Sequence, residues 1–125
     1  GEENPDVLSK VFFGTLAPAT PGSRIDEFQK ACADIGIKVN GLFPSLGADT
    51  IKIIAYGIEA SGSTDPVAIR EAIRAADSIP VMSVESISFK DTKSYALREI
   101  PVIGFKDGKR VVLAQDIPAN VPSWP

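Results

Sequence analysis

Residues 41–61 constrain the fold of this chain more than any other stretch, because they favour a helix that is apolar around most of its circumference. Its large apolar residues include Leu46, Ile51, Ile54 and Ile58, and only three positions within it are charged. A helix with so few polar positions has to bury several of its sides. We therefore expect it to be largely covered by other elements.

One further helix is predicted before this stretch and one after it. Ser23, with Asp26 three residues later, indicates the start of a helix that ends at Gly36. Asp65 and Pro66 suit the N-cap and the first helical position of another helix. Each of these signals depends on neighbouring residues only.

Short strands are predicted before and after the helices. A buried strand is expected from an apolar run near the N-terminus, and the apolar period changes from helical to alternating after Pro80. Asp107-Gly108 between two β-branched runs predicts a hairpin. The expected strands span residues 11–16, 81–84, 86–89, 100–106 and 110–115. The residues by themselves therefore indicate a small α+β domain, with three helices and short, mostly antiparallel strands that are too few to form a broad sheet.

The composition of the chain argues against several classes of function. The net charge is −3, and Lys and Arg are not clustered, which argues against nucleic-acid and anionic-membrane partners. There is no histidine, so the commonest metal ligand and general base are missing. We expect no catalytic residue, no metal and no cofactor. The single cysteine, Cys32, cannot form a disulfide within the chain and is expected as a small core residue of the helix at 23–36.

A series of short motifs, taken in order, covers nearly the whole chain. The longest reads GADTIKIIAYGIEASGSTDPVAIREAI. The motifs span residues 4–8, 12–15, 27–28, 47–73, 87–89, 102–113 and 121–122. Their order and spacing resemble the carboxy-terminal part of type I periplasmic solute-binding proteins, the branched-chain amino-acid binding proteins that feed ABC importers.

The resemblance implies a fold of two α/β lobes that are joined by three crossing segments. Residues 11–16 resemble the second crossing and residues 86–89 the third, so Phe13, Gly14, Thr15, Ser86 and Ile87 are the expected hinge residues. The chain would be one partial domain, the last third of such a protein, with the sheet strands of both lobes upstream of Gly1. Residues 1–16 and 81–125 would belong to the second lobe and the crossings, and residues 17–80 to the helices of the first lobe.

The implied function is that of a solute-binding component of an ABC importer for amino acids or related small organic acids. Solute would be trapped between the lobes by hinge closure, and the closed form would dock on the membrane permease. The resemblance implies a periplasmic or extracellular location.

Three residues of this chain bear on the ligand. In the family an acidic residue holds the ligand's amino group; here it either precedes Gly1 and is absent, or is replaced by Glu2 or Glu3. For both glutamates, a solvated and charged terminus is the favoured interpretation. The family often has a tyrosine where Ala48 stands, which indicates a ligand that is larger than leucine or different from it.

A second hypothesis is a stand-alone interaction module without a ligand cleft. If no other part of the protein covers the apolar helix at 41–61, self-association would bury it. This hypothesis predicts a homo-oligomer of the chain. An enzyme is not expected, because no motif organises the Asp, Glu and Lys side chains.

Overall fold

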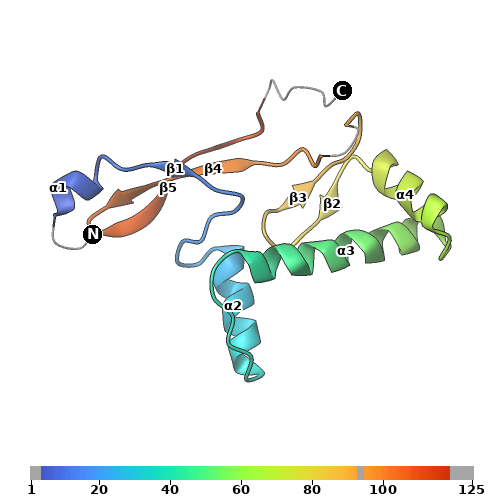
Figure 1. Cartoon of the computed structure of the whole chain (residues 1–125), viewed down its shortest axis with the longest axis horizontal. Coiled ribbons are helices and arrows are strands. Elements are labelled where there is room, and N and C mark those ends of the chain that lie inside the picture. Colours follow the sequence, from blue (N-terminus) through green and yellow to red (C-terminus); the bar gives the residue numbers. More distant parts are fainter. Residues whose placement is uncertain (1–3, 93–94, 119–125) are drawn as a thin grey trace.

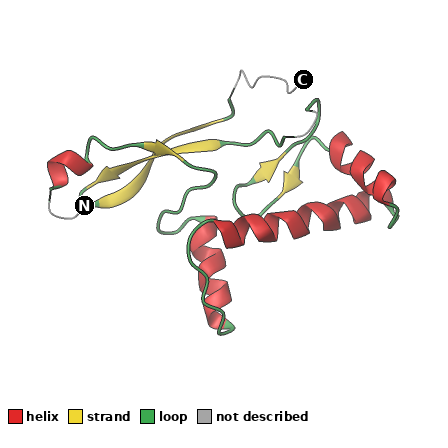
Figure 2. Cartoon of the chain, in the orientation of Figure 1, coloured by secondary structure: helices red, strands yellow, loops and turns green. Residues whose placement is uncertain are grey.

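The computed structural model describes residues 4–92 and 95–118, and these combine helices with antiparallel strands. Figures 1 and 2 show an elongated molecule with two parts. The helical part contains three helices and a two-stranded sheet, and the sheet part contains a three-stranded sheet with a short helix at its end. The mixed helix-and-sheet composition agrees with the predicted fold class.

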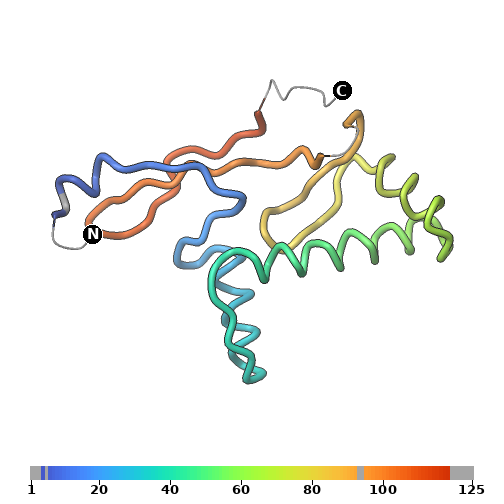
Figure 3. Tube along the Cα trace, viewed as in Figure 1, coloured from blue at the N-terminus to red at the C-terminus, as the bar shows by residue number. Residues whose placement is uncertain are grey.

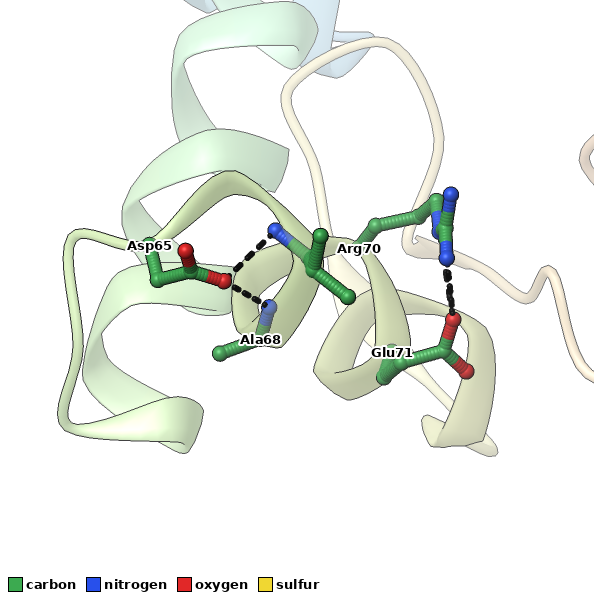
Figure 4. Close-up of polar contacts among 5 residues, drawn as sticks. Asp65, Ala68, Arg70 and Glu71 are labelled. Atoms are coloured by element: carbon green, nitrogen blue, oxygen red, sulfur yellow. Dashed lines mark hydrogen bonds and ion pairs between the residues drawn. The ribbon is translucent and has the colours of Figure 1, made fainter.

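Local capping chemistry starts two helices of the helical part where the sequence predicts. Helix α2 (Arg24–Asp34) begins after Ser23, whose hydroxyl accepts a hydrogen bond from the backbone N–H of Asp26. Helix α4 (Pro66–Ala75) begins after Asp65, whose carboxylate accepts bonds from the N–H groups of Val67 and Ala68 at 2.9 and 3.0 Å (Figure 4). These side chains satisfy N–H groups that a helix terminus leaves without a partner.

Helix α3 (Phe43–Ser61) is the longest element, with 19 residues and a length of about 28 Å. It ends at Gly62, which has a left-handed φ of 61°. Helix α4 packs back against it, and the buried Gly57 of α3 lies against α4. A Cβ atom placed on Gly57 would lie 2.8 Å from Ile69 and 2.9 Å from Ile73, so only glycine allows this spacing.

The predicted strand at 81–84 is wrong, and the one at 86–89 is confirmed at residues 86–87 only. The structure has strand β2 (Ile79–Pro80) and strand β3 (Ser86–Ile87), which pair antiparallel, with residues 81–85 as the loop between them. The N–H groups of Met82 and Ser83 donate to the side chain of Asp49 and not to a strand. Hydrogen bonds donated to a distant helix therefore replace the predicted ladder.

The hydrophobic core of the molecule lies where this small sheet meets the helices. Its members come from the β2–β3 hairpin, from the N-terminus of α2, and from the segments that precede α2 and β2. The buried core residues are Ala17, Ile25, Ala76, Ile79, Val81, Val84 and Ile87. Cys32, predicted as a core residue, is only half-buried, and Ile35 on the same stripe is 73% exposed. Helix α2 thus contacts the core through its first turn and then projects away from it (Figure 1).

The sheet part has the strand order β1-β4-β5 and is antiparallel throughout. Strand β4 (Ile100–Lys106) and strand β5 (Lys109–Asp116) form the predicted hairpin. Its turn residues Asp107 and Gly108 both have positive φ, 51° and 73°, as a type I′ turn requires. Strand β1 (Phe13–Gly14) pairs with β4, and a one-turn helix α1 (Pro5–Leu8), which the sequence analysis did not predict, precedes it.

Two burial predictions are wrong for the described part of the chain. Helix α3 was expected to be largely covered, but an apolar stripe along it is open. Its members Phe43, Ile51, Ile54 and Ile58 are 80, 68, 44 and 38% exposed. The predicted buried strand at 11–16 is reduced to two residues and is also exposed. The reason is the same in both places: no described element lies over these apolar faces.

Candidate functional site

Two segments connect the helical part to the sheet part, and we call them the passages. The first passage, residues 15–23, leads from β1 to α2. The second passage, whose described residues are 88–92 and 95–99, leads from β3 to β4. Figure 3 traces the first passage in blue and the described residues of the second passage in orange. Any change in the angle between the two parts has to bend these segments.

The predicted hinge residues do not come together in one place. Phe13 and Gly14 lie in β1, opposite Ile103 and Val102 of β4. Thr15 follows at the start of the first passage, where its N–H donates to the carbonyl of Pro101 at 3.0 Å.

The other two predicted hinge residues, Ser86 and Ile87, form strand β3 of the helical part. They line a cavity of about 330 Å³ that is also lined by Ser88 and Leu97 of the second passage. These two residues thus lie directly before the second passage, as Phe13 and Gly14 lie directly before the first.

The predicted ligand-binding residues are also separated. Glu2 and Glu3 lie outside the described residues. Ala48 is half-buried on α3, one position before Asp49.

A buried polar network joins the two parts at the passages, and the sequence analysis missed it. Asp49 on α3 is 4% exposed and accepts hydrogen bonds from the N–H groups of Met82 and Ser83 at 2.6 and 2.9 Å, and from the Ser83 hydroxyl. The same hydroxyl accepts a bond from Nη2 of Arg98 at 2.8 Å. Nη2 of Arg98 also donates to the carbonyl of Leu16. We call Asp49, Ser83, Arg98 and the Leu16 carbonyl the junction network.

The junction network places a guanidinium between the two passages. Arg98 belongs to the second passage and Leu16 to the first, while Ser83 and Asp49 belong to the helical part. Burial lowers the pKa of Arg98 from its ordinary value, and the nearby Asp49 carboxylate opposes that shift. The guanidinium therefore has an electrostatic reason to stay beside Asp49, in addition to its two hydrogen bonds.

The chemistry of this network is structural. Ser83 is 1% exposed, so a substrate could not reach its hydroxyl without a local opening of the loop. In the residues that the structure describes, no three His, Cys, Asp or Glu side chains are close enough together to hold a metal ion. Within the same part of the chain, every helix falls short of the length and apolarity needed to span a membrane.

One sequence signal could have indicated part of the network. Asp49 stands on the inner face of α3, four positions after the buried Ser45 and four before the half-buried Ile53. A carboxylate on the covered side of an apolar helix needs a hydrogen-bond partner. For Arg98 no such signal exists, because its partners are distant in the sequence.

Comparison of the chain with models of protein families and with characterised proteins found no match.

Proposed function

We propose that this chain is the C-terminal segment of a solute-binding component of an ABC importer, and that the complete component binds amino acids or related small organic acids by hinge closure. The observation that supports this proposal best is the division into two parts joined by the two passages. In such a binding protein, two lobes rotate about connecting segments while each lobe stays rigid.

The exposed apolar faces support the same proposal. The stripe Phe43, Ile51, Ile54 and Ile58 follows one side of α3 at nearly helical spacing. In an α/β lobe, each helix packs its apolar side against the sheet. On this proposal the sheet of the first lobe covers α3, and further strands of the second lobe extend the sheet of β1, β4 and β5.

The junction network fits the same function. Its hydrogen bonds hold the two passages side by side while the loop at residues 81–85 stays fixed to α3. A fixed pivot of this kind allows rotation of one part relative to the other with little change inside either part.

A distance measurement across the two parts tests the proposal. Cysteines replace Lys30 on α2 and Lys109 on β5, both exposed, in the Cys32→Ser background of the full-length polypeptide that contains these residues. We expect an amino acid or small carboxylate to change energy transfer between dyes at these sites. Dyes at positions 30 and 59, both in the helical part, are the matched control and should show no change. An unchanged distance with every amino acid and small carboxylate would contradict the proposal.

The exposed stripe on α3 favours a second candidate function, a self-associating interaction module. A second copy of the chain would cover the stripe in that case. The solute titration and the light-scattering experiment described in the Discussion distinguish the two candidates.

A further inference from the structure

A pocket of about 290 Å³ lies against both passages, next to the junction network. Leu16 contributes to it from the first passage and Arg98 from the second, while Pro118 follows the end of β5. Ala48 and the five predicted hinge residues are not among its described lining residues. The uncharged lining residues are Leu16, Tyr95, Ala96, Leu97, Ile100 and Pro118.

Arg98 is the one charged residue among the described residues of this lining, and its hydrogen bonds leave part of the guanidinium unused. Nη2 makes both of the bonds described above, to Ser83 and to Leu16. Nε is buried and has no hydrogen-bond partner among the described residues. A buried donor without a partner costs free energy, and the cost is larger when the group is charged.

The charge of Arg98 is also only partly compensated. Burial is the largest influence on its pKa and lowers it, while the Asp49 carboxylate acts in the opposite direction and does not cancel the effect. Asp49 already accepts three hydrogen bonds from Met82 and Ser83. An additional anion beside Arg98 would therefore compensate the remaining positive charge of its guanidinium.

We propose that the pocket binds a small apolar carboxylate. The anionic group pairs with the guanidinium of Arg98, and an aliphatic or aromatic tail lies against Leu16, Leu97 and Ile100. Pockets for small molecules commonly combine apolar walls with a few polar groups that orient the ligand. Arginine is well suited to the polar role, because charge-assisted bonds to a carboxylate are among the strongest hydrogen bonds in proteins.

Such a ligand would contact both passages at once. Leu16 lies on the first and Leu97 on the second, so a bound tail links them in addition to the hydrogen bond from Arg98 to the Leu16 carbonyl. The site is lined by residues of both passages of this chain. It concerns this chain alone and does not depend on the transport proposal.

Hexanoate and 1-hexanol are matched probes for the site, because they share an apolar tail and differ in charge. We expect hexanoate, titrated into the 125-residue chain, to cause saturable shifts in the amide NMR signals of residues 95–98 and 100. Hexanol should bind at least tenfold more weakly. Equal affinity for the two probes would overturn the role of Arg98, and the absence of saturable shifts with hexanoate would overturn the site.

Two variants separate binding in the pocket from loss of structure. Leu16→Trp fills the pocket but keeps the backbone carbonyl that Arg98 uses, so we expect at least a tenfold loss of hexanoate affinity. Val11→Trp is the matched control, because Val11 is as exposed as Leu16, at 44%, and does not line the pocket. Hexanoate affinity that is unchanged by Leu16→Trp, or lost equally in Val11→Trp, would contradict the proposal.

Discussion

Asp49 and Ser83, 34 residues apart in the sequence, are joined by two hydrogen bonds, from the N–H and from the hydroxyl of Ser83 to the Asp49 carboxylate. This pair fixes the loop between β2 and β3 to α3. It also positions the Ser83 hydroxyl to accept a bond from Arg98. The hydrogen bond from Arg98 to the helical part therefore depends on one buried carboxylate.

Replacement of Asp49 should destabilise the chain strongly. Asp49→Ala removes the acceptor for two N–H groups and the carboxylate nearest to Arg98, and we expect a loss of about 3–5 kcal/mol in the free energy of unfolding. Asp49→Asn keeps one carbonyl acceptor and should cost less. Chemical denaturation measures both values. Asp34→Asn, at an exposed site on α2, is the control and should stay within about 0.5 kcal/mol of the unchanged chain. A similar effect of Asp49→Ala and Asp34→Asn would contradict the role of the network.

The two non-terminal glycines of α3 should respond in opposite ways to alanine. At Gly57 a methyl group would meet Ile69 and Ile73 at less than 3 Å, so we expect Gly57→Ala to destabilise the chain by about 1–3 kcal/mol. At Gly47 nothing lies within 4 Å of the added carbon. Gly47→Ala should therefore stabilise the helix by about 0.5–1 kcal/mol. Thermal unfolding of the two variants tests the close approach of α3 and α4, and the same sign of change in both would contradict it.

The exposed stripe on α3 should drive self-association of the 125-residue chain. We expect light scattering at tens of micromolar to give the mass of a dimer or a larger oligomer, because the four open apolar residues have no described cover. Ile51→Glu should shift the population toward the monomer. Thr64→Glu adds the same charge at an exposed position outside the stripe and should leave the mass unchanged. A clean monomer mass for the unchanged chain would show that the stripe does not associate.

The exposed ion pair between Lys90 and Asp77 gives a pH prediction. Its N–O distance is 2.6 Å, and the hydrogen bond and charge of Asp77 raise the pKa of Lys90 above its ordinary value of 10.5. Because the folded pKa is raised, the contribution of the pair is present below pH 10.5 and is lost as pH rises through the folded pKa. NMR titration of the Lys90 side chain should give a pKa that falls in Asp77→Asn. An identical pKa in both chains would contradict the pairing.

The sequence predicts those parts of the fold that depend on neighbouring residues. Ser23 and Asp65 bond to N–H groups two or three positions later, and Asp107-Gly108 forms its turn alone. The sequence could not show that residues 81–84 form a loop and not a strand. Asp49, more than 30 residues away, accepts the hydrogen bonds of N–H groups that a strand ladder would use.

The candidate site was harder to predict than the helices. The resemblance directed attention to Ala48, but the structure places the polar contacts on the next residue, Asp49. The hydrogen bond from Arg98 to the carbonyl of Leu16 spans 82 residues. No local pattern signals such a contact, and the burial of Arg98 depends on where the passages meet.

Calorimetric titration of the full-length polypeptide that contains these residues tests the central proposal most directly. Amino acids and small organic acids are added one at a time to the purified protein. A solute-binding component predicts saturable binding of at least one of them, with one site per chain and sub-millimolar affinity. No binding heat with any of these solutes at several temperatures would contradict the transport function.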